Sequence, residues 1–263
     1  MDRSLISASL LTLLLSLSSF HFVDSTTFKI VNRCQHTIWP GILIGANRTA
    51  LTPTGFTLES GKSRTLTAPK SWPGRFWART LCSNDSSGKF SCVTADCGSG
   101  KVKCAGAGSI PPATLAEFTL NGDRGLDFYD VSLVDGYNLP MLVEATGGTS
   151  GGCYSTGCVA NLNRVCPAEL RVARGNLGVA GRSPCEAFGD PQRLTSPHWK
   201  STPVGVRSIF RSTPDTCQPS VYSQLFKHAC PRSYTYAYDD KTSTFTCAAA
   251  DYIITFCPSS PSS

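Results

Sequence analysis

Thirteen cysteines constrain what this chain of 263 residues can fold into more than any other feature of its sequence. All of them follow residue 33, and so many thiols are untypical of a reduced cytosolic protein of this size. A framework of disulfides is therefore expected, in which each bridge typically stabilises a fold by about 2–4 kcal/mol. Because thirteen is an odd number, at least one thiol must lack a partner within the chain.

Four of these cysteines lie in the stretch 82–104, separated by turn-forming residues. This spacing predicts short loops stapled to strands. Metal binding is the alternative use of clustered cysteines, but His36, His198 and His228 do not lie at zinc-ligand spacing from any cysteine pair. We therefore expect no metal and no cofactor.

Residues 1–25 have the features of a secretory signal peptide: a charged start, a short apolar run and small residues near Ser25. The apolar run is too short and too rich in serine to span a membrane. No later stretch approaches about 20 consecutive apolar residues. The sequence therefore predicts a secreted protein with no transmembrane segment, formed by residues 26–263.

The formal net charge of +6 and the isoelectric point near 8.7 favour contact with anionic surfaces such as cell walls. A modest positive charge is as readily explained by solubility alone. Lysines and arginines do not cluster among aromatic residues, which argues against nucleic acid as a partner.

Short alternating runs separated by Gly, Pro, Asn and Asp predict a mainly β fold, a sandwich or a barrel. The first strand is expected over Thr27–Asn32 and the last over Tyr252–Cys257. Cys34 and Cys257 flank these strands and could tie them together. The sandwich is expected to comprise about residues 26–150 and 247–263.

The clearest hairpin joins Leu115–Leu120 to Leu126–Val134 through an Asn-Gly-Asp-Arg-Gly turn. A turn centred between residues 123 and 124 places Glu117 directly opposite Asp130. Two directly opposed acids repel each other unless something compensates, so this pair calls for an explanation.

From Cys153 onward the composition changes to loops, which predicts a disulfide-rich subdomain of loops and a helix over about residues 151–246. One helix is expected, Val221–Ala229, with apolar residues on one face and Pro231 just beyond its end. Ser220 is a suitable N-cap.

The chain closely resembles the thaumatin-like family of plant pathogenesis-related proteins over nearly its whole mature length. The most specific motif is the stretch 88–104, Gly-Lys-Phe-Ser-Cys-Val-Thr-Ala-Asp-Cys-Gly-Ser-Gly-Lys-Val-Lys-Cys. Further matching runs are Phe76-Trp77-Ala78-Arg79-Thr80, Thr114-Leu115-Ala116-Glu117-Phe118, Asp127-Phe128-Tyr129-Asp130 and Tyr236-Ala237-Tyr238-Asp239-Asp240. The resemblance implies a thaumatin-like β-sandwich carrying the subdomain.

The resemblance also implies sixteen cysteines in eight bridges, whereas this chain has thirteen. Cys166 is expected to be a free thiol, because Gly181 occupies the place of its usual partner. Cys185 and Cys217 lose adjacent partners and are hypothesised to pair with each other, near an atypical segment at 193–211. The intact pairs implied are Cys34–Cys257, Cys82–Cys92, Cys97–Cys104, Cys153–Cys247 and Cys158–Cys230.

Members of the family typically carry an acidic cleft formed by one arginine and four acids. Position by position, the resemblance implies Arg79 as the organising cation and Glu117, Asp130, Asp135 and Asp239 as the acids, with Asp239 preferred to Asp240. Without the family, Asp135 before Gly136 is better explained as a turn former, and Asp239 as part of a solvated turn.

Such a cleft could bind sugar hydroxyls, receive a cationic partner or hydrolyse a glycosidic bond with a pair of acids. For hydrolysis, Glu117 is expected to be the proton donor, with Asp130 or Asp135 as base or nucleophile. Binding is favoured over efficient catalysis.

The resemblance implies an antifungal protein that binds β-1,3-glucan of fungal walls and damages the wall or membrane. We expect the protein to be a monomer of the apoplast. The alternatives are a weak endo-β-1,3-glucanase and an inhibitor of a foreign hydrolase. Asn47 and Asn84 begin glycosylation acceptor motifs, so a glycoprotein is expected.

Overall fold

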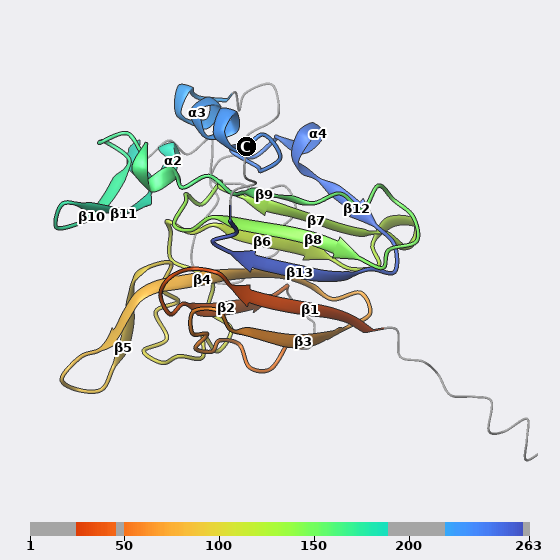
Figure 1. Ribbon diagram of the computed structural model, residues 1–263, viewed down its shortest axis with the longest axis horizontal. Helices are drawn as coiled ribbons and strands as arrows, with labels where there is room; N and C mark the ends of the chain where they lie inside the picture. The colour runs from red at the N-terminus through yellow and green to blue at the C-terminus, as the bar shows by residue number, and fades with distance from the viewer. Residues whose placement is uncertain (1–24, 46–49, 189–218, 260–263) are drawn as a thin grey trace, which may run out of the picture.

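The structure is a computed structural model that describes residues 25–45, 50–188 and 219–259. The proposed signal peptide up to residue 24, the acceptor Asn47, the atypical segment 193–211 and Cys217 lie outside the described residues, so the proposed Cys185–Cys217 bridge is not described either. The prediction of a mainly β, sandwich-like fold is confirmed, because two large sheets contain most of the regular secondary structure of the described residues (Figure 1).

The first sheet has five strands in the order β3-β1-β13-β8-β9. Strands β1 and β13 run parallel, and the other neighbours are antiparallel. The expected first and last strands are therefore side by side, joined by the Cys34–Cys257 bridge. The strand bounds are β1 Ser25–Asn32, β3 Ser63–Pro69, β8 Met141–Thr146, β9 Thr156–Cys158 and β13 Asp251–Phe256.

The second sheet has six strands, with β12-β7-β6-β4-β2 in order and β5 paired to the far part of the long strand β4. All of its neighbours are antiparallel. The bounds are β2 Trp39–Ile44, β4 Pro73–Asn84, β5 Phe90–Thr94, β6 Leu115–Thr119, β7 Asp127–Ser132 and β12 Phe245–Cys247.

Aromatic side chains fill the space between the two sheets. The ring of Phe28 on β1 lies 4.8 Å from the rings of both Phe76 and Phe118 across the sandwich, and 5.7 Å from that of Tyr252. Burial of each such side chain stabilises the fold by roughly 1.5–3 kcal/mol. Because side chains alternate along a strand, the neighbours of these aromatics in the second sheet point out of the sandwich on its other side.

The predicted hairpin is formed by β6 and β7, and its turn contains the short 3-10 helix η1, Asp123–Gly125. Arg124 within that turn has a φ of 54°, the left-handed region. The strands begin and end within two residues of the predicted bounds.

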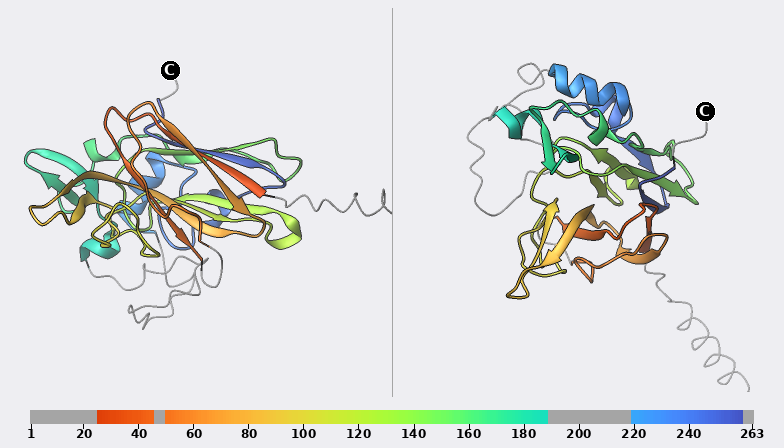
Figure 2. Two further views of the ribbon diagram at one scale, coloured as in Figure 1. Left: turned by 90° about the horizontal axis from the view of Figure 1, so that it is seen from below. Right: turned by 60° about the vertical axis from the view of Figure 1, so that its left-hand side comes forward.

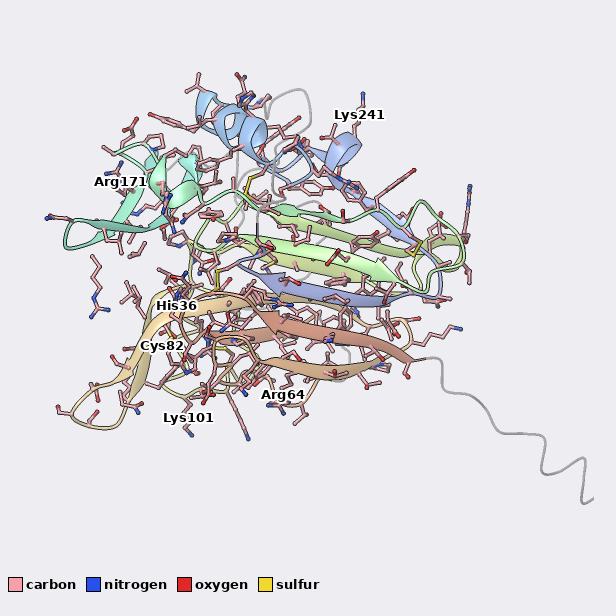
Figure 3. The ribbon with its side chains drawn as sticks, viewed as in Figure 1. His36, Arg64, Cys82, Lys101, Arg171 and Lys241 are labelled. Atoms are coloured by element: carbon pink, nitrogen blue, oxygen red, sulfur yellow. A yellow bond between two sulfur atoms is a disulfide. The ribbon has the colours of Figure 1, made fainter. Side chains whose placement is uncertain are left out.

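A smaller unit packs against one end of the sandwich, on the side away from β3 (Figures 1 and 2). Arg171 on its hairpin and Lys241 on its last helix mark its two sides in Figure 3. A second apolar core of Leu133, Tyr137, Leu170 and Phe226 holds it to the sheet. Its elements are η2 Leu162–Arg164, the hairpin β10 Arg171–Arg174 and β11 Leu177–Gly181, α2 Pro184–Phe188, α3 Val221–Ala229 and α4 Asp240–Ser243.

Helix α3 has the bounds predicted from the sequence, Val221–Ala229. The hydroxyl of Ser220 accepts a hydrogen bond from the backbone N–H of Ser223 at 3.1 Å, which satisfies one of the free donors of the first turn. The expected N-cap is therefore confirmed.

The structure contains the five disulfides that the resemblance implied. Cys158–Cys230 joins β9 to the end of α3, and Cys153–Cys247 joins the start of the subdomain to β12. Cys166 is a buried free thiol. A Cβ atom added to Gly181 would lie 2.8 Å from its sulfur, so the glycine does face Cys166.

Candidate functional site

Three charged residues form a line across the middle of the six-stranded sheet. Arg75 on β4 is directly opposite Glu117 on β6, and Glu117 is directly opposite Asp130 on β7. The expected register of Glu117 and Asp130 is confirmed. Since the adjacent residues Phe76, Phe118 and Tyr129 are buried in the sandwich core, these three side chains point to the opposite face, toward the subdomain.

Asp135 joins this line from the turn that follows β7. One guanidinium nitrogen of Arg75 lies 4.0 Å from a carboxylate oxygen of Glu117 and 4.0 Å from one of Asp135. The Arg75 side chain is only 16% exposed, which reduces solvent screening of both ion pairs. Arg75 therefore balances part of the negative charge of Glu117 and Asp135.

Asp130 is the most perturbed acid of the group. Burial raises the pKa of its carboxyl well above the ordinary value, and the charges of Glu117 and Asp240 raise it further. Its Oδ1 atom is buried and accepts no hydrogen bond from any described residue. Asp130 therefore keeps its proton to higher pH than an ordinary aspartate.

Two effects act on the pKa of Asp135 in opposite directions. Burial raises the pKa of its carboxyl, whereas the nearby Arg75 lowers it. About a third of its side chain, 35%, remains exposed. Its carboxylate can therefore reach a ligand at the surface while it stays paired to the guanidinium.

The fourth acid is Asp240 and not Asp239, which corrects the expectation from the resemblance. Asp239 is buried, and its carboxylate pairs with Lys227 of α3 at 2.9 Å and accepts hydrogen bonds from Thr235 and Thr242. Asp240 is exposed, and its charge acts on Asp130. We call Glu117, Asp130, Asp135 and Asp240, with Arg75, the acidic row.

Arg79 does not lie in the acidic row, which corrects a second expectation. Strand β6 pairs with β4 only over residues 73–76, so Arg79 is about 13 Å further along the strand than Arg75. Its guanidinium is fully buried and donates to the carbonyls of Trp39, Pro40 and Val102. Burial lowers its pKa to about 10, and it holds loops together rather than acids.

Helix α2 adds an acid that the sequence analysis missed. Glu186 lies near Asp135, whose charge, together with burial, raises the pKa of the Glu186 carboxyl. Arg182 lies 3.7 Å from Glu186 and opposes this shift. The row thus extends from the sheet toward the subdomain. Only knowledge of how α2 packs on the turn after β7 could have revealed it.

A small hollow open to solvent adjoins the row at Val134, the residue before Asp135. It encloses about 230 Å³ of space, open solvent included. None of its lining residues is one of the acids, so it lies beside the row rather than around it. The lining residues are Val134, Ser183, Pro184, Ser220, Ser223, Thr235 and Tyr236.

Comparison with known proteins identifies the family. Residues 32–258 match the model of the Thaumatin family. The chain belongs to the thaumatin family. It is 53% identical over 260 residues to thaumatin-like protein 1 of Arabidopsis thaliana, covering 95% of this chain and 94% of that one. The resemblance drawn from the motifs is thus confirmed.

Another relative in the thaumatin family bears an enzyme's name. It is glucan endo-1,3-beta-glucosidase of Prunus avium, 50% identical over 251 residues, covering 94% of this chain and 97% of the relative. Among solved structures, a laminaripentaose-producing β-1,3-glucanase in complex with laminaritetraose aligns with a TM-score of 0.54 at 14% identity. That alignment covers 89% of this chain and 99% of the glucanase and shows a shared fold.

Two further expectations fall on described residues. Asn84 is exposed at the end of β4, where its glycosylation stays a prediction. No helix among the described residues is long and apolar enough to cross a membrane.

Proposed function

We propose that this protein is a secreted defence protein of the plant apoplast that binds β-1,3-glucan of fungal cell walls through the acidic row. Binding would weaken the wall or the membrane beneath it. One observation carries the proposal: four carboxyl groups gather at one face of the sheet, and two of them pair with the mostly buried Arg75.

The chemistry of the row suits sugar hydroxyls. Ionised carboxylates only accept hydrogen bonds, and each hydrogen bond to a charged group contributes about 1.5–3 kcal/mol. The partly exposed Asp135 and the exposed Asp240 can accept from hydroxyls. Protonated Asp130 would supply a donor at the centre. A polysaccharide strand offers both hydrogen-bond donors and acceptors, whereas a cationic group would offer no acceptor for the proton of Asp130.

Binding of insoluble and soluble β-1,3-glucan tests the proposal. Glu117→Gln should weaken affinity for laminarihexaose at least about tenfold, the equivalent of one lost charged hydrogen bond, and Asp130→Asn about two- to tenfold, the equivalent of one uncharged hydrogen bond. The matched control is Glu144→Gln, since Glu144 is exposed on β8 in the other sheet. Wild-type protein that fails to bind glucan, or equal losses in the control, would reject the proposal.

Hydrolysis is the second candidate, and the perturbed Asp130 supports it. A glycosidase needs one protonated acid and one ionised carboxylate. The role of proton donor passes in this proposal from Glu117 to Asp130, because burial and the charges of Glu117 and Asp240 raise the pKa of the Asp130 carboxyl. Asp135 or Glu117 would then act as base or nucleophile.

The two candidates separate on one variant. If the row only binds, Asp130→Asn should reduce binding and wild-type protein should release no reducing sugar from laminarin above a heat-treated sample. If it hydrolyses, Asp130→Asn should abolish release of reducing sugar, while Asp123→Asn at the exposed η1 turn should retain it.

A further inference from the structure

Tyr234 is fixed to the end of β7 by its backbone. Its N–H donates to the carbonyl of Val131 at 2.9 Å, and its carbonyl accepts from the N–H of Leu133 at 2.8 Å. The residue is 3% exposed. These two bonds flank the strand end that carries Asp130, so the phenol ring has little freedom to move relative to that acid.

The hydroxyl of Tyr234 reaches the outermost acid of the row. It donates to Oδ1 of Asp240 at 2.7 Å and also contacts the hydroxyl of Thr244. Asp240 itself is exposed on α4, and an exposed carboxylate without such a bond would turn toward water. Tyr234 therefore holds the exposed side chain of Asp240 in a fixed position relative to strand β7.

Several charged groups surround the hydrogen bond between Tyr234 and Asp240. Asp130 faces Glu117 from β6 and Asp240 from α4, with Arg75 of β4 beyond Glu117. The cation nearest to α4 from helix α3, Lys227, pairs with Asp239. Lys241, adjacent to Asp240, points outward from α4 (Figure 3).

Burial raises the pKa of Tyr234 far above its ordinary range, so the phenol remains a donor at every relevant pH. Among the described residues, nothing donates to Oδ1 of Asp130. The two acids therefore differ: Asp240 accepts a hydrogen bond from the Tyr234 hydroxyl, whereas Oδ1 of Asp130 is buried and accepts none from a described residue.

We propose that Tyr234 is a positioning residue that holds the Asp240 carboxylate beside Asp130, so that the charge of Asp240 acts on the Asp130 carboxyl. This inference deepens the proposed function and rests on it only for the claim that glucan meets these acids. Tyr234 does not itself need to touch the ligand.

The test is the titration of the Asp130 carboxyl, followed by ¹³C NMR in wild-type protein and in Tyr234→Phe. Without the hydroxyl, the Asp240 charge is released toward water, its repulsion of Asp130 falls, and the Asp130 titration midpoint should move to lower pH. Affinity for laminarihexaose at neutral pH should fall about two- to tenfold, the equivalent of one hydrogen bond.

Tyr252→Phe is the matched control. Its hydroxyl is also buried and also donates to an aspartate, Asp127, at 2.9 Å, but inside the sandwich. Both variants should lose stability, and only Tyr234→Phe should move the Asp130 midpoint. Equal midpoints in Tyr234→Phe and wild type, or an equal shift in the control, would overturn the inference.

If Tyr234→Phe is not secreted, Asp240→Ala serves as a second variant, because Asp240 is exposed and its replacement should be tolerated by the fold. The Asp130 midpoint should again fall, and the NMR resonance of the Tyr234 hydroxyl proton should move. An unchanged hydroxyl resonance would refute the contact. The titration does not depend on glucan, so a wild-type protein that binds none rejects the proposed function and still decides the role of Tyr234.

Discussion

Glu117 and Asp130 lie directly opposite each other on β6 and β7, and both point away from the sandwich core. Two acids in this position repel each other by an amount comparable to a favourable cross-strand pair, about 0.2–1 kcal/mol, and more when burial removes water. Arg75 compensates Glu117 only from the far side. The acidic row therefore lowers the stability of the fold, which is typical of functional sites.

Replacing Asp130 by Asn should stabilise the protein at neutral pH. Burial, Glu117 and Asp240 raise the pKa of Asp130 in the folded state, whereas in the unfolded chain the carboxyl ionises near pH 3.9. Between these two values only the folded state holds the proton, so the free energy of unfolding falls as pH rises. Asparagine has no such proton to lose.

The gain from Asp130→Asn should be near zero at pH 3 and on the order of 1 kcal/mol at pH 7, or roughly 2–4 °C in melting temperature. Thermal unfolding at both pH values measures it, with Asp123→Asn as the control because that side chain is 79% exposed. A variant less stable than wild type at pH 7 would show that Asp130 is not a strained acid.

Replacement by Gln should have different effects at Arg75 and Arg79: it should weaken glucan binding at Arg75 and lower stability at Arg79. Arg79→Gln removes the donor of three carbonyl groups, those of Trp39, Pro40 and Val102, and leaves them buried. Each unsatisfied group costs about 1–3 kcal/mol, so the variant should unfold at much lower temperature or fail to be secreted.

Arg75→Gln should leave the melting temperature within a few degrees of wild type, because its partners are the acids of the row. Glucan affinity should fall at least about tenfold as the acids repel one another and take up protons. Unfolding followed by circular dichroism and binding calorimetry separate the two arginines. Equal behaviour of the two variants would contradict the assignment.

The sequence contained the parts of this fold that local patterns determine. The hairpin register follows from a five-residue turn, and α3 follows from its apolar spacing and the Ser220 cap. Arg75 and Arg79 could not be separated, because both lie on one face of the same strand. Only the length over which β6 pairs with β4 places one beside Glu117 and the other beyond it.

Adjacent acids posed the same difficulty. Asp239 and Asp240 differ by one position, and the sequence does not say which of them turns toward Lys227. That choice depends on the packing of α3 against the loop before α4, which is a contact between distant parts of the chain. Glu186 and Tyr234 were missed for the same reason.

Asp239 and Asp240 should therefore separate stability from binding. Asp239→Asn breaks a buried ion pair with Lys227 and leaves that ammonium without its countercharge, a loss of about 3–5 kcal/mol for fully buried pairs. The Lys227 side chain is 25% exposed, so a smaller loss, roughly half of that, is expected.

Asp240→Asn should change stability little, because the side chain is exposed, and should weaken glucan binding. Urea unfolding and laminarihexaose binding, measured on both variants, give the comparison. If Asp239→Asn instead impaired binding at unchanged stability, Asp239 would be the ligand-facing acid.

Gly181→Cys should restore a sixth bridge among the described residues. The added Cβ would lie 2.8 Å from the sulfur of Cys166, close to the roughly 3 Å that separates a Cβ from the second sulfur of a disulfide. The position needs no left-handed backbone, since Gly181 is absent from the positive-φ glycines. Closing a loop of about 15 residues should stabilise the protein by up to about 3 kcal/mol.

Gly178→Cys, also on β11, is the matched control for this bridge, because its Cβ would meet Asn163 and Arg171 instead of Cys166. In Gly181→Cys, peptide mapping without reduction should find residues 166 and 181 in one linked peptide pair, and Cys166 should resist alkylation even in denaturant. In wild type and in Gly178→Cys, denaturant alone should expose Cys166 to alkylation. A freely alkylated Cys166 in Gly181→Cys would mean that β11 does not hold residue 181 against this thiol.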